Sequence, residues 1–98
     1  MPKLISKNED LFIDDEHGTK YKVLRGWESL SGWYWFATKK IGTQLCVING
    51  KEIEDTIWFG FIQGYKDEWG TFSQAEIESL SPQTWEILKE NLHFSGRR

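Results

Sequence analysis

Apolar residues in this chain fall into short runs, several of which alternate with polar residues and most of which end at glycine, asparagine or aspartate. Alternation is typical of a half-buried strand, because successive strand side chains point to opposite faces of a sheet. The pattern predicts about five strands in antiparallel order, within residues 11–13, 20–27, 32–39, 44–54 and 55–64.

Glycine marks two special positions in the second half of this pattern. Asn49-Gly50 lies between apolar runs, and a type I′ hairpin turn needs positive φ at both central residues, so this dipeptide predicts a hairpin. Gly60 interrupts the apolar run of residues 55–64, and a glycine inside a strand often marks the close approach of another backbone. The sequence therefore predicts a β-ribbon that is crowded at Gly60.

Four aromatic residues in a row form the centre of the predicted strand over residues 32–39. Trp33 and Trp35 would point to one face of the sheet, and Tyr34 and Phe36 to the other. Both faces therefore need a cover. We expect C-terminal helices to cover one face, while sheet curvature, the N-terminal segment or a partner closes the other.

Helix signals appear only near the C-terminus. Ser73, followed three residues later by a glutamate, is a capping-box pattern that predicts a helix over residues 73–80. Ser81 and Pro82 repeat the start signal, and apolar residues at helical spacing predict a second helix over residues 81–94. The apolar residues of this second pattern are Trp85, Leu88 and Leu92.

Strands followed by helices indicate an α+β fold. We predict a curved antiparallel sheet of four to five strands followed by one or two short C-terminal helices. Residues 11–94 would form this single α+β domain, between a flexible N-terminus at residues 1–10 and a flexible basic tail at residues 95–98.

Composition limits the function classes. The 98 residues carry a net charge of −3 with a pI near 5.3, which disfavours a general nucleic-acid binder, because such proteins neutralise phosphates with Lys and Arg. Cys46 is the only cysteine, so no internal disulfide forms, and no apolar run has the length of a signal peptide or a membrane span. We expect a cytoplasmic protein that does not enter a membrane, as a monomer or as a weak homodimer through an edge strand.

Four stretches of the chain follow one another with short spacers: WYWFAT (33–38), WFGFIQG (58–64), EWGTFSQAEIESL (68–80) and ENLHF (90–94). Together they resemble, over residues 20–94, a family of short uncharacterised bacterial proteins that is catalogued as a domain of unknown function. The chain departs from that family in having LFIDDEHG in place of a Pro-rich segment and Gln74 in place of leucine. Such proteins are often carried on plasmids and other mobile elements, so the resemblance implies an interaction with a host factor and names no activity.

The densest group of chemistry-bearing residues lies at the predicted strand-to-helix junction. Glu68, Ser73 and Glu76 would form a polar site at this junction, where the N–H groups of the helix N-terminus can hold an anion, or Ser73 and Glu76 would only cap the helix. His93 would act as a general base only if the fold brings it within hydrogen-bond reach of a partner. A small enzyme around Glu68, Ser73 and His93 is therefore one alternative.

The other titratable candidates fit no known motif. His17 in DDEHG matches no standard spacing of metal ligands, and Cys46 has no identifiable base to activate it. We therefore predict no catalytic residue, no metal and no cofactor.

Aromatic residues offer a different kind of site. Exposed rings would form a protein hot spot or a stacking platform for single-stranded nucleic acid, and Trp27 and Trp69, both in predicted turns, are expected to be the most exposed. A local basic rim beside the rings would come from Lys20, Lys22, Arg25, Lys39 and Lys40. The predicted binding residues are Trp27, Trp33, Trp35, Tyr65, Trp69, Glu68, Ser73 and Glu76.

The leading hypothesis is a non-enzymatic protein-interaction module, encoded by a mobile element and acting on a host factor as an inhibitor or anti-defence protein. Its partner would be a protein that binds the exposed aromatic and acidic surface. A binder of single-stranded nucleic acid that uses exposed aromatics is the second hypothesis, which the net charge disfavours. The small enzyme is the third.

Overall fold

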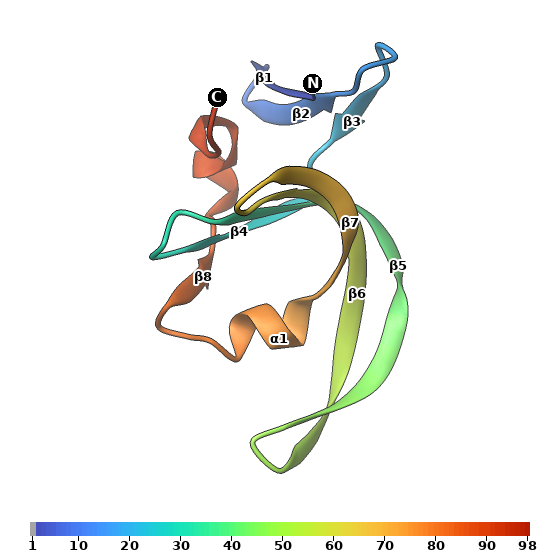
Figure 1. The fold of residues 1–98 in the computed structure, drawn as a ribbon, viewed down its shortest axis with the longest axis vertical. Helices are drawn as coiled ribbons and strands as arrows, with labels where there is room; N and C mark the ends of the chain where they lie inside the picture. The colour runs from blue at the N-terminus through green and yellow to red at the C-terminus, as the bar shows by residue number, and fades with distance from the viewer. Residues whose placement is uncertain (1) are drawn as a thin grey trace.

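The computed structural model describes residues 2–98 and contains two antiparallel sheets (Figure 1). The smaller sheet has three strands in chain order: β1 (Lys3–Lys7), β2 (Asp10–Asp14) and β3 (Lys20–Lys22). The larger sheet has five strands in the order β7-β6-β5-β4-β8. Its strands are β4 (Arg25–Ser29), β5 (Tyr34–Ile48), β6 (Lys51–Gln63), β7 (Asp67–Ser73) and β8 (Thr84–Glu86). Helical structure is limited to α1 (Gln74–Glu78) and the 3₁₀ helix η1 (Lys89–Phe94).

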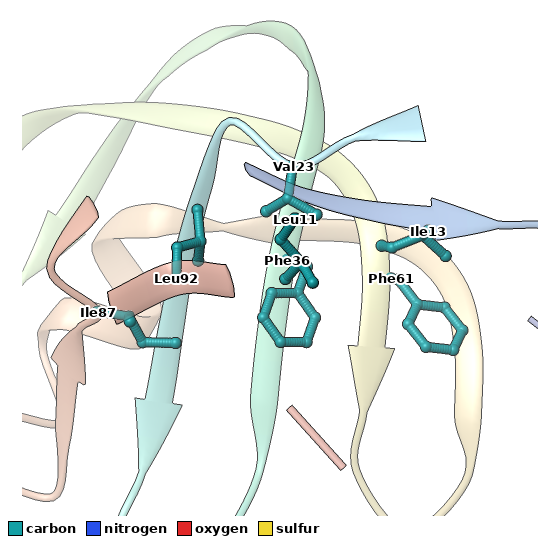
Figure 2. Packing of buried hydrophobic residues seen from close by; sticks show 7 residues of the cluster. All are labelled: Leu11, Ile13, Val23, Phe36, Phe61, Ile87 and Leu92. Atoms are coloured by element: carbon teal, nitrogen blue, oxygen red, sulfur yellow. The ribbon is translucent and has the colours of Figure 1, made fainter. Parts of the chain in front are cut away.

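Each face of the aromatic strand has its own hydrophobic core. Phe36 points to one face, where the N-terminal sheet and η1 cover it (Figure 2). This first core contains Leu11, Ile13, Val23, Phe36, Phe61, Ile87 and Leu92. Ala37, the next residue along β5, points to the opposite face, which α1 covers with Ile77. This second core contains Trp27, Ala37, Trp58, Phe72 and Ile77.

Strands β5 and β6 form a long curved hairpin that continues well beyond their neighbours (Figure 1). Asn49 and Gly50 close it with φ of 53° and 78°, which confirms the turn that this dipeptide predicts. The register shifts between Ala37 and Lys39 and again between Lys40 and Gly42. Such bulges increase the local twist of a strand, which is consistent with the curvature of the hairpin.

The prediction of a second helix over residues 81–94 is wrong. Residues Thr84–Glu86 form strand β8, which pairs with the free edge of β4 through Ser29, Glu28 and Trp27. This pairing leaves Trp85 and Leu88 exposed, although their helical spacing predicts a buried stripe. A helix would have offered no partner to the unpaired backbone groups of β4, whereas a strand provides one.

The two ends of the chain lie against the domain rather than apart from it. Lys3–Lys7, which lie in the segment expected to be a flexible N-terminus, pair with β2 over their full length. At the other end, the side chain of buried Gln63 donates to the Arg97 carbonyl at 2.7 Å and accepts from the Arg97 N–H at 2.7 Å. These bonds hold the C-terminal residues against β6. Neither helix of residues 2–98 is long and apolar enough to cross a membrane.

Candidate functional site

An open apolar hollow lies beside α1 on the face of the larger sheet that carries the second core. Helix α1 covers Trp27 and Trp58 through Ile77 but ends at Glu78, and Leu80 then forms one wall of a hollow of about 560 Å³. We call this hollow the aromatic groove. Its lining residues are Ser29, Leu30, Ser31, Trp33, Trp35, Leu80, Gln83 and Thr84, none of which is charged.

Rings at one end of the aromatic groove support one another. The Trp33 and Trp35 centroids lie 5.8 Å apart, and Tyr65 meets Trp33 edge-on at 5.2 Å. Trp33 also packs against the backbone of Gly64, where a Cβ atom would lie 2.5 Å from the ring. Because these contacts fix the ring positions, a ligand would lose little conformational entropy in ordering them.

Large apolar side chains at this groove remain in contact with solvent. Leu30 is 74% exposed, Leu80 is 55% exposed and Tyr65 is 95% exposed, while Trp33 and Trp35 are half-buried. Contiguous exposed apolar surface of this kind often marks an interaction site in a soluble protein. The groove therefore brings together two of the predicted binding residues, Trp33 and Trp35, and a third, Tyr65, lies against Trp33 outside the lining.

Two other predicted aromatic residues lie elsewhere. Trp27, expected to be exposed in a turn, is a β4 residue that is fully buried, with its indole N–H donating to Glu78. Trp69 belongs to β7 and is half-buried, with its ring stacked on Phe59 at 5.8 Å. The expectation of greatest exposure at Trp27 and Trp69 is therefore wrong, because strand pairing moves both residues out of turns.

The predicted basic rim does not border the aromatic groove. Arg25 lies over Trp27 at 5.1 Å and binds Glu86 through two nitrogens, and this hydrogen bonding raises the pKa of its guanidinium. Lys20 and Lys22 lie on β3 near Asp14 and Asp10, at 4.0 and 3.8 Å. Lys39 and Lys40 lie farther along β5.

Ser73 caps α1, and Glu76 takes part only through its backbone N–H. The Ser73 hydroxyl accepts a hydrogen bond from the Glu76 N–H at 3.1 Å and donates to the carboxylate of Asp55 at 2.5 Å. Asp55, which is 1% exposed, also accepts from the N–H of Ala75 at 2.8 Å. These contacts agree with the capping interpretation. Glu68 is exposed on β7 and pairs with Ile62.

Asp55 is a structural residue that the sequence analysis missed. In the sequence, Asp55 stands at the start of an apolar run, residues 55–64, that contains no other charged residue. A buried carboxylate needs hydrogen-bond donors, and the serine and backbone N–H groups at the start of a helix provide them. A sequence reader who meets such an aspartate should therefore look downstream for a serine that caps a helix, because that serine can bind the carboxylate.

Glu68, Ser73 and His93 do not come together. Ser73 is engaged by Asp55, whereas His93 lies on η1 with its carbonyl accepting from Ser6 and Arg98 of the chain ends. The Nδ1 atom of His93 is buried and has no hydrogen-bond partner within residues 2–98. Nor does that part of the chain contain a group of three or more His, Cys, Asp or Glu side chains that could hold a metal.

The phenol of Tyr34, the first residue of β5, titrates with a perturbed pKa. Burial, together with the hydrogen bond that its hydroxyl donates to Glu28 at 3.1 Å, raises the pKa of Tyr34. We expect Glu28→Gln to lower that pKa, measured as the ultraviolet absorbance of tyrosinate against pH, with Tyr34→Phe identifying the signal. Because the folded-state pKa is raised, the stabilisation from the neutral phenol is present below the unfolded pKa of about 10 and is lost as the pH rises further. An unchanged titration in Glu28→Gln would show that Glu28 has no part in the shift.

Comparisons of the chain with protein-family models, with curated proteins and with solved structures find no match in any of the three. The resemblance to a family of uncharacterised bacterial proteins therefore stays a prediction. Inferences about function depend on the geometry of the residues described above.

Proposed function

We propose that the protein is a non-enzymatic protein-interaction module that binds its partner through the aromatic groove. The observation that carries this proposal is the half-open pair Trp33 and Trp35, bordered by exposed Leu30, Leu80 and Tyr65. Aromatic residues in a hollow that a bound partner closes off from water are typical of the energetic centre of a protein interface.

The lining of the groove indicates what the partner presents. Its floor is aromatic and aliphatic, and its polar residues are Ser29, Ser31, Gln83 and Thr84. No lining residue carries a charge that could pair with an acidic or basic side chain of the partner. Burying such a side chain in the groove would therefore cost desolvation free energy without compensation. The partner would therefore insert a large apolar side chain from a protein segment and hydrogen-bond at the rim.

The same lining disfavours single-stranded nucleic acid. A stacking platform for nucleic acid usually lies in a positively charged groove, because the phosphates supply much of the affinity. Here the candidate basic residues Arg25, Lys20 and Lys22 are placed next to carboxylates. The resemblance to proteins of mobile elements suggests the identity of the partner. It would be a protein of the host cell, and binding would inhibit that host protein.

A peptide-display selection tests this proposal. Peptides are selected on the wild-type protein and counter-selected on a Leu30→Ser/Leu80→Ser variant, which removes two groove walls that are exposed and contribute little to either core. We expect peptides with a bulky apolar anchor, which bind the variant at least about tenfold more weakly.

The matched control is Tyr21→Ser/Leu24→Ser, which removes exposed apolar residues outside the groove. It should bind the selected peptides as the wild type does. Failure to obtain any peptide that distinguishes wild type from the groove variant would contradict the proposal. Quenching of tryptophan fluorescence by oligo-dT at low salt, lost in the groove variant, would instead support a nucleic-acid binder.

A further inference from the structure

A second hollow, separate from the aromatic groove, lies between the two sheets. Its volume is about 420 Å³, which is within the range of small-ligand pockets. The smaller sheet lines it with Tyr21 of β3 and with residues of the turn after β2, and the larger sheet lines it with residues of β6 and β7. None of its lining residues belongs to the aromatic groove. We call this hollow the ring pocket.

Three aromatic rings in two orientations line the ring pocket. Phe59 and Trp69 lie on one face of the β6–β7 pair, with their centroids 5.8 Å apart and their planes only 7° apart. Tyr21 reaches Trp69 from the smaller sheet, with the two centroids 5.2 Å apart and the planes at 64°. The face of an aromatic ring carries negative potential, so rings gathered around one hollow attract a cation together.

No described cation of the chain already occupies these rings. Within residues 2–98, the cation that lies over aromatic rings is Arg25, and its rings are Trp27 and Trp58 of the second core. Tyr21 is 37% exposed, and the other two rings of the pocket are half-buried. Ring surface in the pocket is therefore open to a ligand.

Carboxylates make the same lining favourable for positive charge. The described lining contains no lysine or arginine, and its acidic residues are Asp15, Glu16 and Asp67. Asp15 accepts hydrogen bonds from the backbone N–H groups of His17 and Thr19, at 2.8 and 2.9 Å. Because these donors are uncharged, they hold the Asp15 carboxylate in place without cancelling its negative charge. Asp67 is partly neutralised by Arg97 at 3.3 Å, which leaves Asp15 as the main electrostatic contribution to the argument.

We propose that the ring pocket binds an organic cation through a quaternary ammonium group. Such a group has no N–H donors, so it needs no hydrogen-bond acceptor from the rings, whereas the ammonium of an unmodified lysine is strongly hydrated. A metal ion is a poorer occupant, because rings offer it no ligand atoms. Nor do residues 2–98 contain a group of three or more His, Cys, Asp or Glu side chains that could hold one. This site is independent of the protein interaction proposed for the aromatic groove.

Choline and its uncharged isostere, in which carbon replaces nitrogen, have nearly the same shape and separate the effect of charge from that of apolar contact. Binding is followed by NMR through the indole N–H signal of Trp69, which the Trp69→Phe variant identifies. We expect choline to bind with a Kd of about 1 mM or below, and the isostere to bind at least about fivefold more weakly.

A peptide that carries trimethyllysine presents the same quaternary ammonium group and distinguishes the source of the ligand. Binding of this peptide at least about tenfold tighter than choline would support the proposal with a methylated protein as the source. Binding of choline as tightly as the peptide would support it with a small molecule as the source.

Two variants test the residues of the pocket. Tyr21→Leu removes one ring, and Asp15→Asn removes a charge while keeping an acceptor oxygen for the turn; each should weaken choline binding at least about fivefold. The matched controls are Phe94→Leu and Glu52→Gln, which remove an exposed ring and an exposed carboxylate outside the pocket and should bind choline as the wild type does. The proposal would be overturned by the absence of any shift with choline or the peptide up to about 10 mM. Equal affinity for choline and its isostere, or unchanged binding in both pocket variants, would overturn it as well.

Discussion

Gly60→Ala should destabilise the protein by about 3 kcal/mol, which lowers the melting temperature of a domain of this size by on the order of 15 °C. Gly60 lies on β6 opposite Ala37, and a Cβ atom there would lie 1.8 Å from the carbonyl oxygen of Phe36. The clashing atom belongs to backbone in the middle of the sheet, so no side-chain rotation can relieve the contact. Strands β5 and β6 would have to separate, and both cores depend on that pair.

Gly42→Ala is the matched control, because Gly42 also lies in the β5–β6 hairpin and a Cβ atom there would meet no atom within 4 Å. We expect its free energy of unfolding to stay within about 1 kcal/mol of the wild type. Urea unfolding followed by tryptophan fluorescence measures both variants. Equal stability of Gly60→Ala and Gly42→Ala would contradict the close approach of the two strands.

Asp55→Ala should destabilise the protein by about 2–3 kcal/mol, because it leaves the Ser73 hydroxyl and the Ala75 N–H without the carboxylate that both now bind. The loss would loosen α1, whose Ile77 covers Trp27 and Trp58. Near-ultraviolet circular dichroism should therefore weaken along with stability. Asp55→Asn keeps one acceptor oxygen and should lose about half as much.

Glu54→Ala is the control for Asp55, since the neighbouring side chain is exposed and should change stability by no more than about 0.5 kcal/mol. The comparison separates the buried hydrogen bonds from the general effect of losing a negative charge on β6. If Glu54→Ala and Asp55→Ala had the same stability, Asp55 would not anchor α1.

Local signals in the sequence predicted the parts of the fold that depend on local chemistry. Asn49-Gly50 forms the expected turn, because the positive φ values that it requires are set within the dipeptide. Ser73 caps α1 as the capping-box pattern indicates. Gly60 also behaves as predicted, since a glycine amid apolar strand residues has few explanations other than a close neighbour.

Features that depend on distant pairing were not predictable in the same way. Helical spacing of Trp85, Leu88 and Leu92 indicates a helix, but the free edge of β4 makes a strand of Thr84–Glu86. Likewise, Lys3–Lys7, which show no clear alternation, form β1 because β2 lies beside them. The partner of β8 is remote in the sequence, and the partner of β1 follows it through a short turn. In neither case does residue spacing alone reveal the partner strand.

The candidate site was predicted in part, for a related reason. Trp33 and Trp35 stand out as members of an aromatic strand, and their half-open surroundings follow from where α1 ends. Leu30 and Leu80 belong to different turns, and only the fold brings them to the same hollow. Trp27 shows the opposite case, since the pairing of β4 on both edges buries a residue that seemed to lie in a turn.

The most direct test of the aromatic groove is an NMR titration of the six tryptophan indole N–H signals with a peptide selected on the wild-type protein. Single Trp→Phe variants assign the signals. We expect the Trp33 and Trp35 signals to shift in proportion to bound peptide, while those of buried Trp27 and Trp58 stay in place. Shifts confined to other tryptophans, with Trp33 and Trp35 unchanged at saturation, would contradict the proposed binding surface.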